Sequence, residues 1–147
     1  MEVKECPYCG SPMNPLAITQ LSVLGISVTF NRPARPFPLY CQTCNRVFFV
    51  VRVNVDYLLG RLELLSPVLE FLNGVFGVTR YREFLRKHFV AFTKRAGRVG
   101  LVGFLQGILR HGLIYDLIFE YQGKRYIISC YKDGKSNKYV CSEVTPA

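Results

Sequence analysis

The sequence predicts an α+β fold: a small β region held by cysteines, a helical middle and a three-stranded antiparallel meander at the carboxyl end. Two Cys-x-x-Cys pairs, at 6–9 and 41–44, enclose segments in which apolar and polar residues alternate. Helix caps and helical periodicity begin near residue 56, and strand patterns return from residue 114. We therefore expect two domains, a metal-bound domain over 1–55 and a helical plus β-meander domain over 56–147.

Two strands are expected in the amino-terminal domain. Residues 21–30 alternate between apolar and smaller side chains, which predicts one strand. Residues 47–55 alternate over a longer stretch and predict a second strand that leaves the second cysteine pair. Between them, the prolines at 33, 36 and 38 favour an extended loop, because proline and the residue before it are poorly accommodated in a helix.

Cap residues predict the first two helices of the middle region. Asp56 is a suitable N-cap for a helix over 57–65. Ser66-Pro67 places a cap before a proline in the first helical turn, so a second helix is expected to run to about residue 72. Asn73-Gly74 is expected to end it.

A strongly basic helix is predicted next, from Arg80 to about Ala96 with Thr79 as its N-cap. Aromatic residues fall on one arc of this helix and cations on the other. Residues 80–111 hold eight Arg and Lys residues against one Glu, a net charge of +7 out of +9 for the chain. Such a charge favours a polyanion. The cations expected to contact it are Arg80, Arg82, Arg86, Lys87, Lys94, Arg95, Arg98, Lys124 and Arg125.

The carboxyl-terminal region predicts strands over 114–121, 125–131 and 138–144, joined by glycine-containing turns. A further apolar helix is expected over 99–109, with three glycines on roughly one side. A helix followed by a hairpin is compatible with a winged helix-turn-helix, in which Lys124 and Arg125 would lie on the wing and residues 99–111 would form the recognition helix. That helix is apolar, which argues for close packing over base reading.

The four cysteines Cys6, Cys9, Cys41 and Cys44 have the spacing of a metal site. Each pair brings two thiolates to one ion from a tight turn. Four thiolates complete a tetrahedral zinc site and leave no position open, so we expect one structural zinc ion. The alternative is two reactive or disulfide-bonded pairs. A thioredoxin-like redox site is disfavoured because the βαβ pattern that accompanies it is missing.

These residues resemble a known superfamily. Cys6-Pro7-Tyr8-Cys9-Gly10-Ser11 and Tyr40-Cys41-Gln42-Thr43-Cys44 are similar to the two knuckles of a zinc ribbon, and the likeness covers residues 1–53. Zinc ribbons occur in archaeal and eukaryal transcription factors, RNA polymerase subunits and ribosomal proteins. The resemblance implies nucleic-acid or polymerase-type partners and does not identify the protein.

Two further cysteines, Cys130 and Cys141, face each other in the expected register of the last two strands. They are interpreted as half-buried thiols, with a cross-strand disulfide as the alternative. The strand carrying Asp116 and the one carrying Cys130 also resemble the core of a restriction-endonuclease-like nuclease. Cys130 occupies the place of that enzyme's second carboxylate, which implies an inactive or incomplete copy.

The sequence therefore favours a non-catalytic nucleic-acid-binding protein that acts on DNA or RNA, and a transcriptional regulator is the role expected for it. Neutralising Arg82, Arg86 and Lys87 together is expected to weaken that binding. The second hypothesis is a protein–protein adaptor or a homodimer, because residues 99–109 are apolar. The most apolar stretch is eleven residues long, whereas a membrane-spanning helix needs about 20. No signal peptide is recognisable, so a cytoplasmic location without membrane partners is expected.

Overall fold

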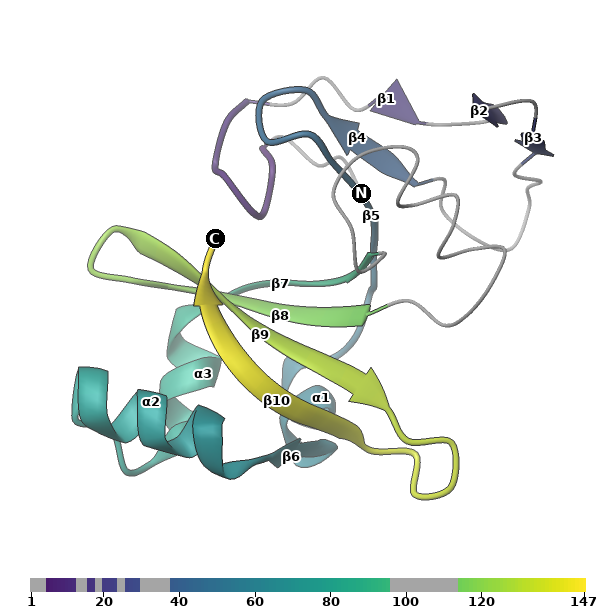
Figure 1. The fold of residues 1–147 in the computed structure, drawn as a ribbon. Helices are drawn as coiled ribbons and strands as arrows, with labels where there is room; N and C mark the ends of the chain where they lie inside the picture. Colours follow the sequence, from purple (N-terminus) through teal and green to yellow (C-terminus); the bar gives the residue numbers. More distant parts are fainter. Residues whose placement is uncertain (1–4, 13–15, 18–19, 24–25, 30–37, 96–113) are drawn as a thin grey trace. The chain divides into compact units, whose positions relative to one another are not determined.

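The computed structural model describes residues 5–12, 16–17, 20–23, 26–29, 38–95 and 114–147, and these form an α+β fold. The chain divides into two compact units (Figure 1). The first unit is Met1–Val51 with Thr93–Ile114, and the second is Arg52–Phe92 with Tyr115–Ala147. The first division falls four residues before the one predicted at 55/56. Residues 93–114, which were expected in the second domain, belong to the first unit.

In the first unit, the described strands are ordered β1 (Leu16–Ala17), β4 (Leu39–Cys41), β5 (Arg46–Val50) and then the end of β7 (Phe89–Arg95). All three pairings are antiparallel. A separate antiparallel pair is formed by β2 (Gln20–Val23) and β3 (Ile26–Thr29). The single strand predicted over 21–30 is therefore wrong. Gly25 was the signal against it, because glycine weakens the interior of a strand.

In the second unit, the strand order is β7, β8 (Ile114–Tyr121), β9 (Lys124–Lys132), β10 (Tyr139–Pro146) and β6 (Leu62–Leu64). Strands β8, β9 and β10 pair antiparallel, and β6 lies parallel to β10. The three strands expected at the carboxyl end are thus inner strands of a larger sheet, with β6 and β7 outside them.

The first two helices differ in length from their predictions. Helix α1 (Val55–Gly60) is capped by Asn54, whose side chain accepts a hydrogen bond from the Tyr57 N–H at 3.1 Å, and Asp56 lies inside its first turn. The expected helix over 57–65 stops early because Leu62–Leu64 pairs with β10 as β6. Helix α2 (Ser66–Phe76) begins with Pro67 in its first turn, as predicted. It continues past Asn73-Gly74 and ends at Gly77, whose φ of 67° suits glycine.

The long basic helix is the largest correction. Helix α3 spans Tyr81–His88, and the chain then continues as strand β7. Its N-cap position is Arg80, with no side-chain cap, where Thr79 was expected. Phe89–Arg95 includes valine, threonine and two phenylalanines, which favour a strand, and its last three residues pair with β5. The helix predicted over 99–109 lies outside the described residues.

Aromatic rings build the core of the second unit. Phe119 of β8 is fully buried. Its ring packs against Phe76 of α2 at 6.0 Å, Phe84 of α3 at 5.7 Å and Tyr126 of β9 at 5.3 Å between ring centroids. These contacts fix α2 and α3 on the same face of the sheet. Among the described residues, no helix has both the length and the apolar character needed to cross a bilayer.

Candidate metal centre

The first cysteine pair lies in a tight turn of the first unit. The Cys6 N–H donates to the Ser11 carbonyl and the Gly10 N–H donates to the Cys6 carbonyl, both at 2.8 Å. Gly10 has a φ of 75°, which glycine adopts without steric cost. Cys6 is buried and Cys9 is exposed, so the turn presents one thiol inward and one toward solvent.

The second pair follows the same plan. Cys41 ends β4, Cys44 lies in the turn between β4 and β5, and Asn45 follows with a φ of 56°. Asparagine tolerates this left-handed conformation better than most residues. The Tyr40 hydroxyl donates a hydrogen bond of 2.8 Å to the Asn45 side-chain oxygen. In both turns, the residue after the second cysteine has a positive φ and reverses the chain around the sulfurs.

The structure brings all four predicted ligands together. Their Sγ atoms lie within 4.8 Å of one another, and the Cys6–Cys44 and Cys9–Cys41 pairs are each separated by 3.7 Å. Four sulfurs bound at about 2.3 Å to one tetrahedral ion lie roughly 3.8 Å apart. The cluster therefore fits a four-coordinate metal ion held by these four thiolates, as expected from the sequence.

The thiols differ in how readily they ionise. Burial raises the pKa of Cys6 far above its ordinary value and also raises the pKa of Cys44. Burial acts in the same direction on Cys9, but hydrogen bonds from the Ser11 hydroxyl and N–H outweigh it and lower the pKa of Cys9 to about 7. Ser11 thus favours the Cys9 thiolate, which is the form that a metal binds.

One residue between the cysteines has a structural role that the sequence reasoning missed. Tyr8 is buried, and its hydroxyl lies 2.6 Å from the Thr93 hydroxyl oxygen. Its ring meets Phe48 edge-on at 5.3 Å, and the Arg46 guanidinium lies over it at 4.7 Å. Tyr8 therefore joins the first knuckle to β5 and to the end of β7.

We predict that Tyr8→Phe lowers the free energy of unfolding by about 1–3 kcal/mol, because it leaves the buried Thr93 hydroxyl without this hydrogen bond. Thr93→Val should have a similar cost, and the double variant should cost less than the sum of the two. Chemical denaturation of the four proteins measures this coupling. Additive losses would show that the two hydroxyls do not stabilise each other.

The predicted nucleic-acid-binding residues fall into separate groups. Arg80, Arg82, Arg86 and Lys87 are exposed on or beside α3 in the second unit. Arg86 is paired with Asp56, and Arg80 lies 3.6 Å from Glu83, so two of these cations have acidic neighbours. The other predicted cations lie elsewhere. Lys94 and Arg95 are on β7 in the first unit, Lys124 and Arg125 begin β9, and Arg98 lies outside the described residues.

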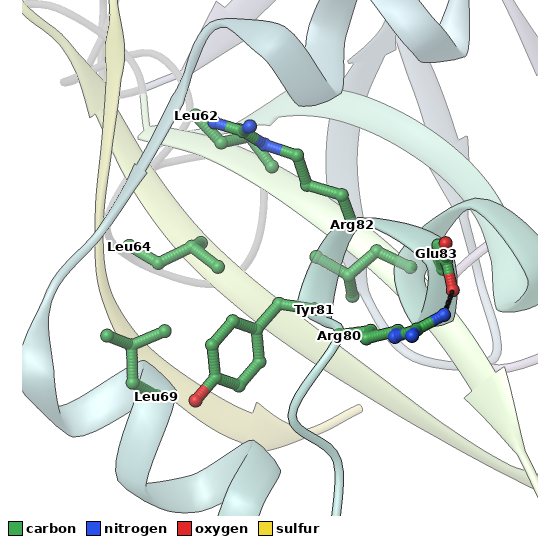
Figure 2. Close-up of a pocket in the computed structure, with 8 residues that line it drawn as sticks. Leu62, Leu64, Leu69, Arg80, Tyr81, Arg82 and Glu83 are labelled. Carbon is green, nitrogen blue, oxygen red and sulfur yellow. Dashed lines mark ion pairs between the residues drawn. The ribbon is translucent and has the colours of Figure 1, made fainter.

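Two hollows in the second unit are lined by α3. One, of about 440 Å³, has leucines of β6 and α2 on one side and Tyr81 with the Arg80–Glu83 ion pair on the other (Figure 2). The second, of about 420 Å³, is lined by Arg80 and Lys87 together with Phe84, His88 and Tyr121. Each hollow thus combines cations of α3 with apolar or aromatic side chains.

The residues of the nuclease-like pattern lie on two faces of the sheet in the second unit. Asp116 is fully buried, pairs with Ser129 across the ladder and accepts a hydrogen bond of 3.3 Å from its hydroxyl. Side chains alternate along a strand, so Cys130 and Lys132 lie on the opposite face from Asp116 and Ser129. Cys130 and Cys141 are buried thiols directly opposite each other, on β9 and β10.

No protein-family model matches this chain, and neither a curated protein nor a solved structure is detectably similar to it.

Proposed function

We propose that this chain is a non-catalytic nucleic-acid-binding protein whose first unit is a ribbon organised by one structural zinc ion. Zinc suits the site because it accepts four thiolates in a tetrahedron without a preference imposed by d-electrons. The two knuckles also share a plan: each has two cysteines in a turn, followed by a residue at positive φ. Four thiolates leave no coordination position for a substrate, so the metal stabilises the fold and takes no part in chemistry.

Charge supports a polyanionic partner. The residues of the first unit include eight Lys and Arg against two Glu, a net charge of +6, and those of the second unit carry the remaining +3. Much of the affinity of a protein for DNA or RNA comes from such cations neutralising backbone phosphates. A role in transcription and a cytoplasmic location remain predictions from the sequence.

The observation that carries the proposal is the position of Arg82 and Lys87. Both side chains are exposed on α3, and each lines one of its two hollows. Neither forms an ion pair with any residue that the structure describes. Cations that are exposed and uncompensated are available to neutralise phosphates, whereas Arg86 already contacts Asp56.

We predict that Arg82→Gln with Lys87→Gln weakens binding to a DNA duplex about tenfold at low salt and lowers the salt-dependence slope by roughly 2. Arg86 is left in place so that its contact with Asp56 and α1 is retained. Fluorescence anisotropy at several salt concentrations, on protein with an unchanged circular-dichroism melt, measures both quantities.

Glu83→Gln serves as a control of opposite sign on the same helix. It removes the acidic partner of Arg80 and should strengthen binding. If the double variant retains the full slope, α3 is not part of the interface.

The second candidate function is a protein–protein adaptor, favoured by the leucine-lined hollow next to edge strand β6. Its lining includes Leu62, Leu64, Leu69 and Leu85, and such apolar hollows accept side chains of a partner. Gel filtration separates the two proposals: dimerisation without salt-sensitive retention on a polyanion column would favour the adaptor.

A further inference from the structure

Aromatic rings and cations gather at one end of the sheet in the second unit, on residues other than the predicted nucleic-acid-binding cations. Tyr57 lies in α1, Arg61 is the C-cap of that helix, Lys132 ends β9 and Tyr139 begins β10. We call these four residues the tyrosine platform.

Short contacts connect the members of the tyrosine platform. The Arg61 guanidinium carbon lies 4.9 Å from the centre of the Tyr57 ring, and the Lys132 Nζ lies 5.9 Å from that of Tyr139. Lys132 and Tyr139 are directly opposite each other in the β9–β10 ladder. The Tyr139 N–H donates to the Arg61 carbonyl at 2.9 Å, which ties the strand pair to the end of α1.

The two tyrosines are held differently. Tyr139 is partly buried, and its ring packs edge-on against Phe92 at 5.1 Å and Tyr115 at 5.0 Å. Burial raises the pKa of Tyr139, and the neighbouring Tyr115 and Tyr57 add to this effect. Tyr57 is 54% exposed on a capped helix, where Arg61 covers part of its ring.

Positive charge borders the tyrosine platform. The turn from β9 to β10 carries Lys135 and Lys138 in addition to Lys132, against one acidic residue, Asp133. The Asp133 carboxylate accepts hydrogen bonds from the Lys135 N–H at 3.1 Å and the Ser136 hydroxyl at 2.7 Å. The Asp133 side chain is therefore held by hydrogen bonds within the turn, and the net charge of the turn is positive because three lysines face one aspartate.

We propose that the tyrosine platform binds single-stranded nucleic acid, with a base stacked on Tyr57 and phosphates contacting Arg61 and Lys132. Unpaired bases expose their faces to aromatic side chains, whereas the bases of a duplex are already stacked on one another. An exposed tyrosine that contacts an arginine, tied through that arginine to a second tyrosine that contacts a lysine, matches that ligand because the group offers both a stacking surface and phosphate contacts. The inference rests on the proposed nucleic-acid binding and adds the kind of strand and a second set of residues.

The experiment compares the zinc-loaded full-length protein with variants by fluorescence anisotropy. The probes are a labelled pyrimidine oligonucleotide of about 15 nucleotides, as DNA and as RNA, and a duplex of the same length. Tyr57→Ala should weaken single-strand binding roughly tenfold, because it removes the ring on which one base stacks. Tyr57→Phe should bind like the native protein, and Arg61→Lys should bind more weakly because lysine lacks the planar guanidinium.

The matched control is Tyr131→Ala. Tyr131 is 55% exposed on β9, so the same amount of aromatic surface is removed outside the tyrosine platform. Single-strand affinity should be unchanged in this variant. An equal loss in Tyr131→Ala and Tyr57→Ala, or native affinity in Tyr57→Ala, would overturn the inference.

The two proposals fail in different ways. Native affinity in Tyr57→Ala, together with duplex binding that depends on Arg82 and Lys87, would overturn the tyrosine platform and keep the proposed function. A wild-type protein that binds none of the three probes at low salt would overturn both. Preference of the wild type for duplex over single strand would overturn the tyrosine platform alone.

Discussion

Replacing Cys41 by serine, or removing the metal with a chelator, is expected to unfold the first unit. Structural zinc sites contribute about 10–16 kcal/mol of apparent binding free energy, and this energy is available only to the folded chain. A whole domain is typically stable by about 5–15 kcal/mol. Loss of the ion therefore removes an amount of free energy comparable to the entire folding stability of a domain.

The dependence on the metal is also expected from the described part of this unit, in which few side chains are buried. Besides the buried ligands Cys6 and Cys41, the side chains that the structure describes as buried in this unit are Pro7, Tyr8, Pro38, Val47, Phe48 and Thr93. Two strands of its sheet, β1 and β4, are only two and three residues long. Within the described ranges, such short strands and few buried side chains supply little apolar burial to offset the conformational entropy of folding.

Elemental analysis and limited proteolysis measure the effect. The native protein should contain one zinc ion per chain, and Cys41→Ser should lose it and be cut rapidly within residues 1–51. Cys141→Ser is the matched control, because Cys141 is equally buried but lies outside the cysteine cluster. It should retain one zinc ion. A Cys41→Ser protein that is as resistant as the native chain would show that the metal does not organise this unit.

The cysteine cluster could be predicted from the sequence because its information is local. A Cys-x-x-Cys spacing fixes two ligands within one turn. A tetrahedral metal ion needs four ligands, so a second pair is expected wherever it lies in the chain. The packing around the cluster is different. Tyr8 and Thr93 are separated by 85 positions, and only the fold shows that their hydroxyls meet.

The basic helix shows why helical periodicity in the sequence predicted the wrong carboxyl-terminal end for this element. Tyr81, Phe84, Leu85 and His88 repeat with a helical period, and the structure forms a helix there. The same pattern was extended through Phe92, but Phe92 is a buried residue of a strand. The end of this segment is a strand because it pairs with β5, and the local sequence does not reveal that pairing partner. As a result, Lys94 and Arg95 belong to a different unit from Arg82 and Lys87.

Similar reasoning explains what was missed at the tyrosine platform. Tyr57 and Arg61 are one helical turn apart, so their contact is readable once α1 is known. Tyr139 joins them because β6 runs parallel to β10, a pairing that the expected helix over 57–65 excluded. Because the segment 57–65 was assigned to a helix throughout, the sequence did not reveal that Tyr57 and Tyr139, 82 residues apart in the chain, belong to one cluster.

Phe119→Ala should be the most destabilising single substitution outside the metal centre. The ring is fully buried and contacts residues of α2, α3 and the neighbouring strand β9. Its removal therefore leaves a cavity where the two helices pack on the sheet. Phe-to-Ala substitutions in cores cost about 3–5 kcal/mol. For a chain of 147 residues, this corresponds to a fall in melting temperature of roughly 10 °C or more.

A graded series makes the cause of that loss testable by thermal denaturation. Phe119→Leu keeps an apolar side chain of nearly the same reach and should cost about 1–1.5 kcal/mol. Tyr131→Ala removes an exposed ring from the neighbouring strand and should change stability by no more than about 0.5 kcal/mol. If Phe119→Ala and Tyr131→Ala lowered the melting temperature equally, burial of Phe119 against the helices would not explain the stability of the second unit. A ranking of Ala, then Leu, then the native residue would show that α2 and α3 are held on the sheet by this ring cluster. The leucine-lined hollow beside α3 depends on that attachment, because α2 and β6 form two of its walls.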